Sequence, residues 1–268
     1  MVKQNDIDDF IQKIPPTPEA LKQTISFLKI GELTKAAAAA ENDLALKSYL
    51  KNIVNKPIYG FKNEVSDISQ IFGILGVSQS QQTVYNYMIN LLSPKEWSLF
   101  KLNEKSFNDL QANLSKKWSI ILQHLDIDDE NISSSISLLP SSIIIAEALF
   151  NKYIDDVNLL RTTKALDYNT ILYRISKLTL FDICEQIAKK WEMDSIISEI
   201  IQNSSGAYTS EDSENKDTIK LAKWMHLLLF YELSQPLFVE AGLNDFIDFQ
   251  IEFVSDIYEE FASVMEIS

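Results

Sequence analysis

The sequence predicts an all-α fold, and three observations support this prediction. Apolar residues recur three and four positions apart along most of the 268-residue chain, which is the period of a helix with one buried face. Helix-starting residues precede several of these runs, such as Asp43 before Leu44 and Ser66-Asp67 before Ile68. The sequence contains no convincing pair of alternating β-branched segments and no Asn-Gly or Asp-Gly hairpin turn.

The first predicted helix follows the segment IPPTPEAL, which starts at Ile14. Pro18 suits the first helical position because its missing N–H would have no partner there, and Thr17 can cap the helix. A proline-rich docking ligand would normally lie in a longer disordered run. Here an amphipathic pattern begins at once, with Leu21, Ile25 and Leu28. We therefore expect a folded domain to begin at residue 14, preceded by a lead-in at residues 1–13.

The following elements divide the domain into two expected lobes. The segment KAAAAAE predicts a short helix whose alanines allow a neighbour to approach closely. Helical patterns follow from Leu44 and from Ile68, and Gly76 indicates the end of the latter helix. Residues 93–106 interrupt the pattern, so we expect an N-terminal helical lobe at 14–104 and a second lobe at 105–235. Residues 203–217 are polar and predict a loop within the second lobe.

Residues 236–268 predict an acidic C-terminal helix packed on the domain. After Lys223 the chain has no lysine or arginine but nine acidic residues, and apolar side chains recur there at helical spacing. A buried apolar face with a solvated acidic face is the favoured interpretation. The alternative is a helix that docks a basic partner or a second copy of the chain.

Composition and charge limit the classes of function. An apolar content of 46% and a charged content of 23% are typical of a globular protein. The net charge of −14, from 24 basic and 38 acidic residues, repels nucleic acid and anionic membranes, and no basic patch offsets it. We expect no nucleic-acid or membrane partner. The single cysteine excludes an internal disulfide and, with no signal-like or membrane-spanning segment, indicates a cytoplasmic protein.

Recognisable reaction chemistry is absent from the sequence. The chain has two histidines, His124 and His226, and the acidic segment that begins at His124, HLDIDDEN, fails as an EF-hand because Asn131 and Ser137 replace the glycine and the closing acid. Cys184 has no nearby histidine or second cysteine, so a small buried apolar role is expected. No catalytic, cofactor-binding or metal-binding residue is predicted. Three residues in apolar helical runs are expected to be structural anchors: Trp118, Trp191 and His226.

Several of these segments, in order, resemble the HDOD domain, a non-catalytic relative of the HD metal-dependent phosphohydrolases in bacterial signalling proteins. The resembling segments span residues 14–230 and are IPPTPEAL, AAAAAENDLALKSYLKNIVNKPIYG, VSDISQIFGILG, IAKKWEMDSIISEII and KLAKWMHLLLF. The resemblance implies an HD-domain or phosphodiesterase-like bundle with an N-terminal helical lobe. This chain has Asp43-Leu44 and Asn55-Lys56 where the family usually has Asp-Pro and Asn-Ser.

The resemblance also implies that a metal site has been lost. The positions matching the first metal histidine and the His-Asp pair of HD enzymes are Ile120, Pro140 and Ser141. Isoleucine and proline side chains offer no lone pair to a metal, and serine is a poor substitute for a carboxylate.

We therefore expect a non-enzymatic signalling module without cofactors that binds a protein partner or a small regulatory ligand. Two alternatives stay open. The first is a divergent metal-dependent phosphohydrolase whose ligands lie elsewhere, in the acidic segment from Asp126 to Glu130. The second is a helical scaffold that forms a homo-oligomer through its C-terminal helix.

Overall fold

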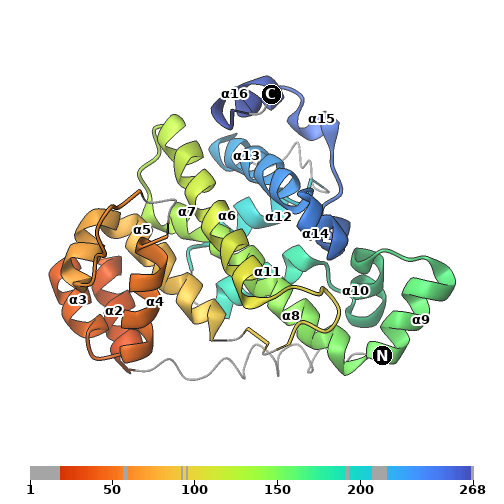
Figure 1. The fold of residues 1–268 in the computed structure, drawn as a ribbon. Coiled ribbons are helices and arrows are strands. Elements are labelled where there is room, and N and C mark those ends of the chain that lie inside the picture. The colour runs from red at the N-terminus through yellow and green to blue at the C-terminus, as the bar shows by residue number, and fades with distance from the viewer. Residues whose placement is uncertain are drawn as a thin grey trace.

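The computed structural model describes residues 19–56, 60–91, 93–94, 96–190, 193–206 and 216–266, and within these ranges the chain is helical without a strand. The all-α prediction is confirmed. The proline-rich segment before residue 19, the anchor residue Trp191 and most of the predicted 203–217 loop lie outside the described residues. Figure 1 shows a smaller group of N-terminal helices on one side of a larger helical body.

The N-terminal lobe consists of α2 (Glu19–Lys29), α3 (Leu33–Ala40), α4 (Leu44–Val54) and, up to Met88, α5 (Ile68–Asn90). The two predicted helix caps are confirmed. Asp43 accepts hydrogen bonds from the N–H groups of Ala45 and Leu46, and Asp67 accepts one from Gln70. Ala36, Ala37 and Ala40 of α3 lie in the core of this lobe, as close packing against α2 and α5 requires.

Helix α5 connects the two lobes and changes direction at Gly76. This residue has φ 72° and ψ 177°, a conformation that is costly for any residue with a Cβ atom. The predicted helix end is therefore present, but a second helical stretch begins immediately after it. Apolar side chains of α5 up to Met88 belong to the N-terminal core, whereas Ile89 belongs to the larger core.

The larger lobe contains two long helices, α6 (Glu104–His124) and α8 (Leu138–Lys152), each of which packs mainly on another helix of this lobe. Around them lie the remaining elements: α7 (Glu130–Ser134), η2 (Ser135–Ser137), α9 (Ile154–Lys164), α10 (Tyr168–Ser176), α11 (Leu180–Lys190), α12 (Ser195–Asn203) and α13 (Lys216–Leu233). The stretch Ile132–Lys152 is long and apolar enough to cross a membrane, but 94% of its most apolar window is buried in the fold. It is a core segment of this fold.

The loop that precedes α6 is fixed by a buried carboxylate. Glu147 of α8 accepts hydrogen bonds from the backbone N–H groups of Ser98, Leu99 and Phe100, at 2.6, 3.1 and 3.2 Å. Asn151, one turn further along the helix, donates to the same carboxylate at 3.1 Å. The acid is thus paired with oriented N–H dipoles, which is one way to keep a charge buried.

The C-terminal segment differs from the single helix that its sequence predicts. It forms four short pieces: α14 (Pro236–Glu240), η3 (Leu243–Phe246), α15 (Ile251–Val254) and α16 (Tyr258–Val264). The breaks have clear backbone causes, because Gly242 is left-handed (φ 75°) and Ile247 is extended (φ −118°, ψ 112°). The segment still packs on the domain, with Phe253, Val254 and Phe261 buried.

Candidate functional site

The three positions matched to HD metal ligands lie in different environments. Ile120 is on α6 with 37% of its surface exposed, whereas Pro140 and Ser141 are buried in the first turn of α8. The Ser141 hydroxyl donates to the Ser137 carbonyl at 2.9 Å, which satisfies it within its own helix. Within the described parts of the chain, no group of three or more histidine, cysteine, aspartate or glutamate residues could hold a metal ion.

Trp118, an expected structural anchor, lies on α6 two residues before Ile120 and belongs to the larger core. Its ring is fully buried, and its Nε1–H donates to the Ile132 carbonyl at 3.0 Å. This bond ties α6 to α7, and it satisfies the indole N–H, which would otherwise be costly to bury.

His226 joins the end of α12 to the C-terminal segment. Its Nδ1 lies 2.8 Å from the Ser204 carbonyl, and its Nε2 accepts from the Gln250 N–H at 3.3 Å. These partners require a neutral ring with its proton on Nδ1. Burial lowers the pKa of His226, which also favours the neutral form. The ring is stacked on Phe249, with 6.1 Å between the ring centroids.

Cys184 is buried on α11, as a small apolar side chain would be. Burial raises the pKa of its thiol to about 12, so the thiol stays protonated at neutral pH. It has neither the ionisation nor the access that a nucleophile needs.

A cavity of roughly 340 Å³ lies between the lobes, and we call it the interlobe cavity. Three structural elements form its wall: α5 on both sides of the Gly76 kink, the end of α6 and the turn that leads to α7. The lining residues are Leu75, Ser78, Gln79, Ser119, Leu122, Gln123, Asp126, Ile127, Asp128, Asp129 and Ser133. Ile120 is not among them, although its neighbour Ser119 is.

The wall of the interlobe cavity is organised by hydrogen bonds between side chains. Ser119 donates to Gln79 Oε1 at 2.8 Å, and Gln79 Nε2 donates to Gln82 Oε1 at 2.8 Å. Gln82 in turn donates to the Ser133 carbonyl at 3.0 Å. The chain of bonds runs from α6 through α5 to α7 and therefore links both lobes at the cavity.

The charge of the interlobe cavity determines which charged groups it favours as ligands. Three aspartates line it, and none of the described lining residues is a lysine, arginine or histidine. An acidic, hydroxyl- and amide-lined wall favours a neutral polar or cationic group and repels a phosphate ester.

A polar seam continues from the interlobe cavity along the contact between α5 and α6. Asn86 donates to the Ser115 hydroxyl at 3.1 Å, and Asn90 donates to Asn108 Oδ1 at 2.8 Å. Gln111 is buried, and neither of its amide atoms has a hydrogen-bond partner among the described residues. The lobes thus meet through amides and hydroxyls, in contrast to their two apolar cores.

Sequence reasoning missed both the interlobe cavity and the seam, although a signal is present. Polar residues recur at helical spacing on each of the two helices, as Gln79, Gln82, Asn86 and Asn90 on α5 and as Asn108, Gln111, Ser115 and Ser119 on α6. Two matching polar stripes indicate a polar contact between helices.

Asn55, in a segment similar to the family's, has a structural role because it exchanges two hydrogen bonds of 2.8 Å with the Val65 backbone.

Comparisons with known proteins agree with this architecture. The family model for the HDOD domain matches residues 14–206. An HDOD domain protein of unknown function from Geobacter sulfurreducens has a similar structure, with a TM-score of 0.60, 12% identity, and coverage of 98% of this chain and 96% of that one. A proposed metal-dependent phosphohydrolase from Shewanella amazonensis SB2B gives a TM-score of 0.50 and 10% identity over 90% and 96% of the two chains.

At these identities the two structures establish a shared fold and nothing about activity. A search of curated protein sequences finds no match. The family match covers well over half of the chain, in the order of motifs that the sequence itself presents. The chain belongs to the HDOD domain family.

Proposed function

We propose that this HDOD protein is a non-enzymatic signalling module of the bacterial cytoplasm that acts by binding a partner. The observation that carries the proposal is the chemistry at the three positions matched to HD metal ligands. Ile120 and Pro140 cannot ligate a metal, and the hydroxyl of Ser141 is already bonded to its own helix. At these three positions, side chains that cannot hold a catalytic metal therefore stand where the HD enzymes have imidazole and carboxylate ligands.

The interlobe cavity is the binding site that we assign to this function. Its lining offers amide, hydroxyl and carboxylate groups from both lobes, so one bound group would contact both at once. Its negative charge favours a basic or neutral polar group of a protein partner or small ligand over a phosphate compound. Such a lining supports the binding of a partner or ligand without a chemical reaction.

Metal analysis and a hydrolysis assay test the non-enzymatic part. The purified chain is incubated with manganese, iron or zinc, desalted, and assayed for bound metal and for hydrolysis of bis(p-nitrophenyl) phosphate. We expect substoichiometric metal and no metal-dependent hydrolysis above the blank. Stoichiometric metal together with metal-dependent hydrolysis would identify a divergent phosphohydrolase and overturn the proposal.

Affinity capture with matched variants tests the cavity. The bait is the folded chain, and the cavity variant carries Asp126→Asn and Asp128→Asn. The control variant carries Glu19→Gln and Glu64→Gln, which remove the same charge from exposed positions outside the cavity. We expect a partner retained by the wild type and the control but lost with the cavity variant. Equal retention by all three proteins would contradict the assignment of the cavity.

A further inference from the structure

Helices α9 and α10 form an arm at the edge of the molecule that the rest of the chain covers poorly (Figure 1). Val157 is the one buried residue of the eleven in α9. Three large apolar side chains of the arm are exposed: Leu159 at 58%, Tyr173 at 53% and Ile154 at 36%. A helix with so little burial gains little from packing within its own chain and needs a further contact to be well stabilised.

The arm is positively charged on a protein that is strongly negative. Residues 152–177 carry five basic and three acidic side chains, in a chain whose net charge is −14. Lys164 and Arg174 are exposed, and neither forms an ion pair with another described residue. The arm therefore presents apolar and basic groups together.

The C-terminal segment, residues 236–266, has the opposite charge. It carries eight acidic and no basic residues. Its exposed apolar side chains are Ile251 at 65%, Leu237 at 49% and Val239 at 46%. Glu240 and Glu252 are exposed and have no basic partner in the described parts of the chain.

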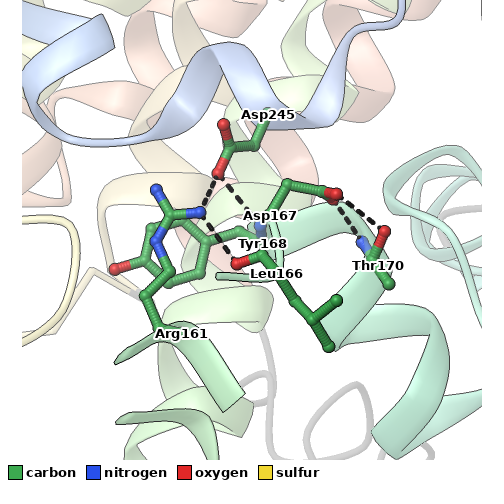
Figure 2. Close-up of polar contacts among 6 residues, drawn as sticks. All are labelled: Arg161, Leu166, Asp167, Tyr168, Thr170 and Asp245. Atoms are coloured by element: carbon green, nitrogen blue, oxygen red, sulfur yellow. Dashed lines mark hydrogen bonds and ion pairs between the residues drawn. The ribbon is translucent and has the colours of Figure 1, made fainter. Parts of the chain in front are cut away.

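The arm and the C-terminal segment are fixed side by side in one chain. Figure 2 shows the connection: Arg161 of α9 donates to Asp245 of η3 at 2.7 Å and to the Leu166 carbonyl at 3.0 Å. The same Asp245 oxygen accepts from the Tyr168 N–H, the first residue of α10, at 3.0 Å. The Arg161 guanidinium also lies 4.3 Å from the centre of the Tyr168 ring. The two complementary surfaces therefore keep a constant relative position.

We propose that the arm of one copy docks on the C-terminal segment of a second copy, forming a two-fold dimer. Because the two surfaces adjoin, a single two-fold axis between them makes the contact twice, once in each direction. Each contact joins basic and acidic groups around exposed apolar side chains, the arrangement of a stable interface. This dimer is independent of the interlobe cavity, so its failure would leave the proposed function in place.

Mass measurement across concentration tests the dimer. Light scattering behind a sizing column should give about twice the 30.6 kDa chain mass, and the dimer should dissociate more readily as salt screens the charged groups. Leu159→Ser should weaken the association by removing an exposed apolar contact. A monomer mass at every concentration would overturn the proposal and leave the surface to another partner or none.

Charge reversal identifies the interface. The arm variant carries Lys164→Glu and Arg174→Glu, and the tail variant carries Glu240→Lys and Glu252→Lys. Each should be monomeric alone, because like charges then face each other in both contacts. Mixing the two should restore a dimer, because both contacts again join opposite charges.

The matched control carries Lys22→Glu and Lys29→Glu, which reverse two exposed lysines on α2, and it should dimerise like the wild type. Circular dichroism verifies the fold of each variant. A dimer that survives both reversals, or a mixture that stays monomeric, would contradict the proposed interface.

Discussion

Mild acid should destabilise the fold through the single buried imidazole of His226. In the native state Nδ1–H donates to the Ser204 carbonyl and Nε2 accepts from the Gln250 N–H. Protonation of Nε2 would remove that acceptor and place a charge among Phe249 and Phe253. Burial accordingly lowers the pKa of His226 below that of an exposed histidine.

The sign of the effect follows from proton binding in the two states. The unfolded chain, with an ordinary histidine pKa of about 6.5, takes up a proton as the pH falls, while the folded chain does not. The His226 contribution is therefore complete above about pH 7.5 and is lost as the pH falls through the unfolded-state pKa. The loss approaches about 1.4 kcal/mol at about pH 5.5 if the native ring stays neutral there.

Urea unfolding at a series of pH values measures this contribution. His226→Gln should be less stable than the wild type at neutral pH by about 1–2 kcal/mol, since one of the two hydrogen bonds is lost. Its free energy of unfolding should then change less between pH 7.5 and 5.5 than that of the wild type. If wild type and variant show the same pH dependence, the titrating group is elsewhere and the reasoning is refuted.

Three further substitutions test separate structural features by the same unfolding measurement. Trp118→Ala should cost about 3–5 kcal/mol, and Trp118→Phe less, about 1–3 kcal/mol, because it chiefly removes one of the two side-chain hydrogen bonds to the Ile132 carbonyl and leaves the bond from the Ser135 hydroxyl; equal costs would mean the hydrogen bond is the whole effect. Gly242→Ala should cost at least about 1–2 kcal/mol, because its Cβ would lie 2.5 Å from the Tyr168 ring at φ 75°; a neutral result would contradict this packing. Glu147→Gln should cost about 1.5–3 kcal/mol and speed amide exchange at residues 98–100, and unchanged exchange would show that the carboxylate does not hold the loop.

The helical architecture could be predicted because its signals are local. Asp43 and Asp67 each precede an apolar run, and a cap acts on backbone N–H groups only two or three residues away. Gly76 was recognisable as a break because glycine adopts left-handed backbone at low cost. The family resemblance added the order of the motifs, which local patterns cannot supply.

The C-terminal segment and the interlobe cavity could not be predicted in the same way because they depend on tertiary contacts. The helical spacing of Phe253, Ile257 and Phe261 is real, but the backbone between the turns bends to place each ring on the body of the domain. The cavity depends on Ser119 reaching Gln79 across the lobes, forty residues away in sequence. Local periodicity indicates which face of a helix is polar and not what that face meets.

The distribution of polar groups suggests how binding could act on this fold. The two lobes have separate apolar cores, and the hydrogen-bonded seam between them leaves both amide atoms of the buried Gln111 without a partner among the described residues. Unpaired buried polar atoms cost free energy, so the seam holds the lobes less firmly than either core holds itself. A ligand bonded to Gln79 and Ser119 would contact α5 and α6 together and favour one relative position of the lobes. Under the proposed function, such a shift would be the signal, because a partner that contacts both lobes would bind most tightly to the relative position that the ligand favours.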